Sequence, residues 1–165
     1  MATGHDIQTA RQIGEHLVAA ELGRMGYVAA PFAGNVPFFD LLAANSAGRT
    51  VPIQVKAIRG QSWQCTANQF LKVELLKSGR QMVRGPTELL NPKLICVFVR
   101  LGKRSGDDRF YIFLLRDLQR YFQRTYKSRR RPRNPKSLHC AIWEKDLIQF
   151  QNNWDLIKEV LGRPT

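Results

Sequence analysis

The sequence is poor in cysteine and histidine, and it has no long apolar run. Its 3 cysteines and 3 histidines lack the spacing of zinc ligands or of a disulfide framework. The longest apolar stretches, residues 94–99 and 111–115, are far too short to span a bilayer. The first residues show no basic segment followed by an apolar one, as a signal peptide would. We therefore expect a protein of the reducing cytoplasm, without structural zinc, disulfides or a membrane span.

Acidic residues are also scarce, and the chain is strongly basic as a result. Its 165 residues include 26 Lys and Arg against 13 Asp and Glu, which gives a net charge of +13 and a pI near 10.3. This charge favours nucleic acid or another polyanion as partner. A basic, ribosome-associated protein is the alternative. The chain has no P-loop, no Rossmann glycine fingerprint and no Gly-x-Ser-x-Gly.

The length of 165 residues fits one compact domain, and the order of the expected elements predicts an α/β fold. Apolar residues recur at helical spacing over residues 6–25 and lie on two flanks, so we expect a first helix that is buried on more than one side. A second helix is expected over residues 116–125 and a third near residues 153–161, whereas residues 67–93 are ambiguous. Strands are expected over residues 27–30, 38–44, 50–58, 62–66, 94–101, 110–115 and 141–143.

Two acidic residues occupy apolar surroundings. Glu15 lies at helical spacing from Leu22, so its carboxylate falls on an apolar flank of the first helix. Such a carboxylate needs a hydrogen bond, a counter-charge or a metal ion, unless it reaches water at the helix edge. Asp40 stands between Phe39 and Leu41 in an expected strand, where aspartate is unfavourable. It either binds backbone amides at a strand end or has a functional partner.

The strand expected over residues 50–58 carries two polar side chains on one face. Gln54 and Lys56 are two residues apart, so both point to the same side of the strand, opposite an apolar face. The alternative is a half-exposed strand whose second face is simply polar. One site for phosphodiester hydrolysis would explain Gln54, Lys56 and both acids together. Such chemistry needs a hard divalent cation held by oxygen ligands, and a lysine there can activate water or stabilise the phosphate.

In this order the motifs resemble the PD-(D/E)XK nuclease superfamily. The resemblance covers about residues 6–60 and rests on Gly14-Glu15, Phe39-Asp40 and Gln54-Val55-Lys56-Ala57. It implies an α/β fold with a restriction-endonuclease-like α-β-β-β-α-β core, whose mixed central sheet is flanked by helices. It also implies Mg²⁺-dependent cleavage, in which Mn²⁺ can substitute. By this analogy the metal ligands are Glu15, Asp40 and Gln54, and the catalytic lysine is Lys56.

The sequence departs from the superfamily pattern at two positions. Phe39 precedes Asp40 where many members have proline, and Gln54 replaces the usual Asp or Glu. Glutamine supplies no negative charge, so the affinity for metal should fall unless Glu15 compensates. Active members with glutamine at this position are known within the superfamily.

A basic segment near the C-terminus suits contact with phosphates. Residues 124–136 contain 7 Lys and Arg and no acid, about half of the net charge of +13. Proline at positions 132 and 135 argues against a helix there, so we expect a basic loop. A solvated loop without a dedicated role is the alternative, and Lys77, Arg80 and Arg84 form a second, more diffuse basic stretch. The expected nucleic-acid-binding residues are Arg124, Lys127, Arg129, Arg130, Arg131, Arg133 and Lys136.

Together these features predict a single nuclease-like domain over residues 1–165, with DNA, duplex or branched, as its partner. We expect a metal-dependent DNA endonuclease that forms a homodimer or a higher homo-oligomer, because cutting both strands of a duplex needs two sites. A Holliday-junction resolvase or a DNA-repair nuclease that reads DNA shape is the alternative within this class. The other alternative is a catalytically inactive DNA-binding protein on the same scaffold.

Overall fold

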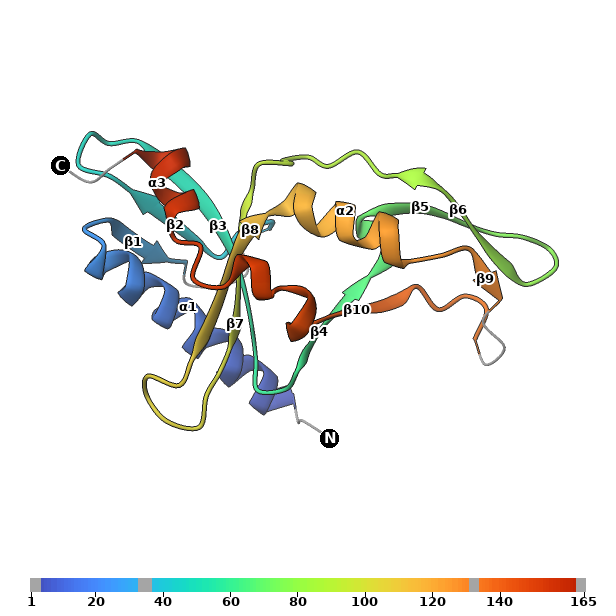
Figure 1. The fold of residues 1–165 in the computed structure, drawn as a ribbon, viewed down its shortest axis with the longest axis horizontal. Coiled ribbons are helices and arrows are strands. Elements are labelled where there is room, and N and C mark those ends of the chain that lie inside the picture. The colour runs from blue at the N-terminus through green and yellow to red at the C-terminus, as the bar shows by residue number, and fades with distance from the viewer. Residues whose placement is uncertain (1–3, 33–36, 131–133, 163–165) are drawn as a thin grey trace. The chain divides into compact units, whose positions relative to one another are not determined.

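The computed structural model describes residues 4–32, 37–130 and 134–162, and its chain falls into two compact units (Figure 1). Unit 1 comprises Met1–Trp63, Leu94–Phe113 and Trp143–Thr165, and unit 2 comprises Gln64–Lys93 and Leu114–Ile142. The single nuclease-like domain over residues 1–165 stays a prediction. No helix in the described ranges is long and apolar enough to cross a membrane.

Unit 1 is built on a five-stranded mixed sheet in the order β1-β2-β3-β7-β8. The first three strands form an antiparallel meander, and β3 pairs with β7 in parallel. The expected α/β class with a mixed central sheet flanked by helices is confirmed. The strand bounds are Val28–Pro31 for β1, Leu41–Ala44 for β2, Thr50–Ile58 for β3, Ile95–Arg100 for β7 and Arg109–Leu114 for β8.

Strand β7 forms the centre of the core of unit 1. Its residues from Ile95 to Val99 have no exposed surface, as their uninterrupted apolar sequence predicts for a strand covered on both faces. Phe98 contacts the rings of Trp63 and Phe113, with centroids 5.2 Å and 4.9 Å away. Cys96 is one of these core residues, as expected of a small apolar side chain.

Helix α1 (Gly4–Arg24) packs against β3 along one stripe (Figure 1). One of the two apolar flanks is buried only in part, because Ile13 and Leu17 keep some of their surface exposed. At Gly14 an added Cβ would lie 2.3 Å from Ala57 Cβ, so the helix backbone rests directly on the strand. This close approach fixes the height of Glu15, the next residue, above β3. The stripe consists of Ala10, Gly14, Val18 and Leu22.

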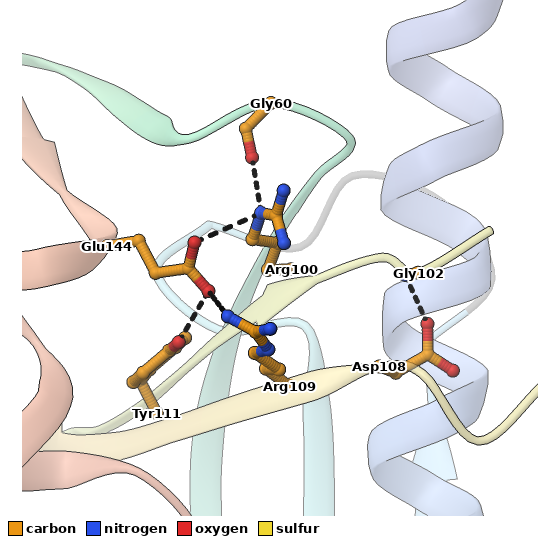
Figure 2. Close-up of polar contacts among 7 residues, drawn as sticks. All are labelled: Gly60, Arg100, Gly102, Asp108, Arg109, Tyr111 and Glu144. Atoms are coloured by element: carbon orange, nitrogen blue, oxygen red, sulfur yellow. Dashed lines mark hydrogen bonds and ion pairs between the residues drawn. The ribbon is translucent and has the colours of Figure 1, made fainter.

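A polar network attaches the C-terminal segment of unit 1 to the sheet (Figure 2). Glu144, in the 3₁₀ turn η2 (Glu144–Asp146), accepts from Tyr111 Oη at 2.7 Å and pairs with Arg100 and Arg109, both at 3.1 Å. Burial raises the pKa of Tyr111 to about 12, and the hydrogen bond to Glu144 acts in the same direction. Tyr111 therefore stays a neutral donor at physiological pH. A further turn, η3 (Ile148–Phe150), is followed by α3 (Asp155–Leu161).

Unit 2 contains a three-stranded antiparallel sheet and the helix α2 (Leu115–Thr125). Residues 67–93, which the sequence left ambiguous, contain the short turn η1 (Ala67–Gln69) and a hairpin of β5 (Leu71–Leu75) and β6 (Arg80–Pro86). The third strand, β9 (Arg129–Arg130), pairs with Arg80 and Gln81 of β6. A separate pair joins β4 (Ser62–Thr66) to β10 (His139–Trp143).

The basic segment at residues 124–136 is a loop only in part. Arg124 lies in the last turn of α2, and Arg129–Arg130 forms β9. Ser128 Oγ accepts from the amide of Val83 at 2.8 Å, which ties the segment to β6. Arg131 and Arg133 lie outside the described residues.

Candidate active site

The first two site residues meet through an arginine that the sequence analysis did not single out. Arg11 Nε donates to Glu15 Oε1 at 2.8 Å, and Arg11 Nη2 donates to Asp40 Oδ1 at 2.9 Å. The side chains of Glu15 and Asp40 are each 12% exposed, whereas that of Arg11 is 45% exposed. The hydrogen bond to Glu15 and the charge of Asp40 raise the pKa of Arg11 above its usual value. The structure therefore brings two carboxylates from separate elements to one cation.

Asp40 is fixed to β3 as well as to α1. Its amide donates to the carbonyl of Ile53 at 2.9 Å, and its Oδ2 accepts from the amide of Val55 at 2.8 Å. Two residues before it, Phe38 adopts a φ of 77°, in the left-handed region that bulky residues rarely occupy. The carboxylate of Asp40 is thus held at the start of β2, between α1 and the backbone of β3.

Gln54 and Lys56 flank the residue that binds Asp40. Both side chains are half-buried, whereas Val55 between them is buried on the opposite face, as the two-residue alternation predicts. Gln54 Oε1 lies 3.9 Å from Cys96 Sγ on β7, and Cys96 is a weak donor. The backbone carbonyl of Lys56 accepts from Trp63 Nε1 at 2.9 Å. Within the described ranges, the ammonium group of Lys56 forms no ion pair.

The two carboxylates of this cluster suit a hard divalent cation that keeps most of its water. Two carboxylates already converge on one positive group. Gln54 points to the face of β3 opposite Val55, whereas α1 packs on Val55 and Ala57, so the structure does not place its amide oxygen on the same face of the sheet as Glu15. Mg²⁺ usually binds through one or two carboxylates together with several waters. Among the described residues no group of three or more His, Cys, Asp or Glu is placed to hold a metal. The roles of Glu15, Asp40, Gln54 and Lys56 remain predictions.

A scan against protein-family models and a search of curated proteins each found no match. Among solved structures, the chain is similar to that of I-Ssp6803I, described as a bacterial homing endonuclease. The TM-score is 0.54, and the match covers 93% of each chain at 13% sequence identity. At this identity the likeness shows a shared fold, and the chemistry has to be argued from the site.

Proposed function

We propose that this protein is a metal-dependent DNA endonuclease of the PD-(D/E)XK type, with its active site in unit 1. The observation that carries the proposal is the position of Asp40. Its carboxylate contacts α1 through Arg11, beside Glu15, and contacts β3 between Gln54 and Lys56. Support for the nuclease class comes from the fold shared with a homing endonuclease.

In the proposed reaction each residue has a distinct role. Asp40 and Glu15 would bind Mg²⁺, with the Gln54 amide oxygen as a neutral third donor. Mn²⁺ can replace Mg²⁺ in the assay. The bound cation supplies a Lewis acid for the phosphate and an activated water. Lys56, on the same strand face as Gln54, donates hydrogen bonds that orient the water or stabilise the phosphate charge.

The proposal is tested by incubating plasmid with the protein and Mg²⁺ or Mn²⁺. We expect nicking or cutting that EDTA abolishes and that Asp40→Asn lowers by about 100-fold or more, because the amide removes the charge that attracts the cation. Asp108→Asn is the matched control. Asp108 also belongs to unit 1 and accepts from a backbone amide, that of Gly102 at 2.9 Å (Figure 2). Equal losses in the two variants would contradict the assignment of Asp40.

The choice of DNA substrate and the oligomeric state belong to the same proposal. A panel of plasmid, linear duplex, four-way junction, flap and single strand separates a general endonuclease from a Holliday-junction resolvase or a repair nuclease. Preferential cutting of the junction or the flap would favour those alternatives. We propose a homodimer as the form that cuts both strands, and sedimentation of the active protein tests it.

A second candidate function is a DNA-binding protein that has lost catalysis. The observation that favours it is the pairing of both carboxylates with Arg11, together with the neutral Gln54 at the remaining ligand position. Wild-type protein that binds DNA but cuts no member of the panel in either metal would select this candidate.

Replacing Arg11 by methionine is expected to make the stability of the protein depend more strongly on divalent metal. The substitution leaves Glu15 and Asp40 close together without their shared counter-charge. Binding of a divalent cation should therefore stabilise the folded variant more than it stabilises the wild type. The measurement is the shift of the unfolding temperature as Mg²⁺ or Mn²⁺ is added. Arg24→Met is the control, since Arg24 pairs with Glu21 on the same helix. Equal metal-induced shifts in the two variants would contradict the shared binding position.

A further inference from the structure

The positive charge of the chain is concentrated in unit 2. Unit 2 contains 14 Lys and Arg and 3 Asp and Glu, so it carries +11 of the net charge of +13 and leaves +2 for unit 1. Of those basic residues, 7 lie in residues 124–136 and the other 7 lie outside that segment. The unit that holds the candidate active site is thus almost neutral, and its neighbour in the chain is a strongly basic module.

Helix α2 packs against β5 and β6 of the three-stranded sheet of unit 2. Tyr126, which follows α2, donates to Gln81 Oε1 at 2.6 Å, and Gln81 is 1% exposed. The rings of Phe70 and Phe122 stack at 4.9 Å, and Gln119 Nε2 donates to the carbonyl of Phe70 at 3.0 Å. On the face of the sheet beside α2, Leu71 and Gln81 are buried, so it forms part of the core of unit 2.

The other face of the sheet is open and mostly basic. Glu74 lies opposite Met82 on the neighbouring strand. Met82 follows the buried Gln81 directly, so the side chains of Glu74 and Met82 point to the opposite face, away from α2. Arg84 Nε lies 2.7 Å from Glu74 Oε2, which places Arg84 on the same face. By the alternation within each strand, Lys72 shares this face with Glu74 and Arg80 shares it with Met82, although the register of the pair shifts between Lys72 and Val73. Both cations are exposed. Three cations and one acid therefore line an exposed antiparallel sheet.

We propose that this open face, defined by Lys72, Glu74, Arg80, Met82 and Arg84, binds the backbone of duplex DNA. A ribbon of two antiparallel strands fits the major groove of duplex DNA, and exposed Lys and Arg on its strands can reach the flanking phosphates. Phosphate contacts of this kind supply affinity and position the protein without reading sequence. The inference rests on the proposed function, because it assigns the substrate-binding surface of that endonuclease to unit 2.

The test measures duplex binding in EDTA, where no cleavage occurs. The variant Lys72→Gln/Arg80→Gln/Arg84→Gln should bind a short fluorescent duplex about 100-fold more weakly near 0.1 M salt, and the salt slope should fall by about 0.9 for each phosphate that is no longer neutralised. The control, Lys103→Gln/Arg104→Gln/Lys145→Gln, removes three exposed cations of unit 1 and the same total charge. It should bind nearly as well as the wild type. Equal losses in the two variants would overturn the proposal.

A second variant excludes loss of folding as the explanation. Glu74→Gln removes the one acid of the open face and should tighten duplex binding severalfold, a direction that misfolding cannot produce. No gain in affinity, or a stronger effect on single-stranded DNA or RNA than on duplex, would also overturn the inference. Loss of cleavage by Asp40→Asn with duplex binding retained tests the endonuclease separately, so each proposal can fail while the other holds.

Discussion

Replacing Lys56 by methionine is expected to lower the rate of DNA cleavage by about 100- to 10,000-fold, the range typical of a lost acid or base group. Lys56 is half-buried on β3, and no ion pair among the described residues holds its ammonium group. Its backbone is fixed by the hydrogen bond from Trp63. The backbone of Lys56 is therefore fixed, while its ammonium group is not held in an ion pair and can act on a substrate. The measurement is the cleavage rate at saturating protein with Mg²⁺ or Mn²⁺.

Binding measured in EDTA separates catalysis from attraction of the substrate. Lys56→Met should bind duplex about as well as the wild type, because unit 2 carries most of the positive charge. Lys145→Met, at an exposed position of η2, should leave the cleavage rate unchanged. A matching loss of binding in Lys56→Met would make Lys56 a phosphate contact instead of a catalytic residue. Lys56→Arg should rescue little, since the planar guanidinium does not reproduce a compact ammonium group.

Local patterns predicted the strands that combine an apolar face with a polar one. The expected bounds of β3 and β4 agree with the structure, because the alternation of their side chains matches their burial. Helix α1 also begins and ends near its expected limits, whereas its burial was overestimated. Apolar residues at helical spacing show that a helix has a buried face, but the width of that face depends on what packs against it.

Helix α2 of unit 2 was predicted within one residue of its bounds, but the sheet of unit 2 could not be predicted from local pattern because its contacts join distant parts of the chain. Glycine and proline interrupt residues 67–93, and the pairing partner that completes the sheet is the two-residue strand β9. Nothing in Arg129–Arg130 alone indicates a strand. Its conformation follows from ladder bonds to β6 and from the anchoring of Ser128 to Val83. Charge composition still identified this part of the chain as the basic one.

The sequence predicted the two acids of the candidate site, but it did not predict that one arginine binds both of them. Glu15 and Asp40 stood out because carboxylates in apolar surroundings need partners, and the structure supplies one to both. Arg11 precedes Glu15 by four residues, a spacing at which opposite charges pair on a helix. That signal was available in the sequence. Its second bond, to Asp40, depends on how α1 packs on β3, and sequence spacing does not show this.

That packing leads to a second large effect, at Gly14. Gly14→Ala is expected to destabilise the protein by about 1–3 kcal/mol or more, because the new methyl group would lie 2.3 Å from Ala57 Cβ and must push α1 away from β3. The effect should outweigh the gain in helix propensity of about 1 kcal/mol that alanine brings. The measurement is the free energy of unfolding in denaturant. Cleavage should also fall, since Arg11 and Glu15 move with the helix while Asp40 stays bonded to β3.

Two variants distinguish this contact from a general effect of alanine in the helix. Gly23 lies in the same helix, and no atom lies within 4 Å of the position that an alanine methyl group would take there, so Gly23→Ala should stabilise the protein slightly. The double variant Gly14→Ala/Ala57→Gly moves the methyl group from strand to helix and should recover most of the lost stability and cleavage. If the double variant is as unstable as Gly14→Ala plus the cost of a strand glycine, α1 does not rest on β3 at this point. Recovery of stability without recovery of cleavage would instead show that the height of α1 above β3 does not set the position of Glu15 and Arg11 in the site.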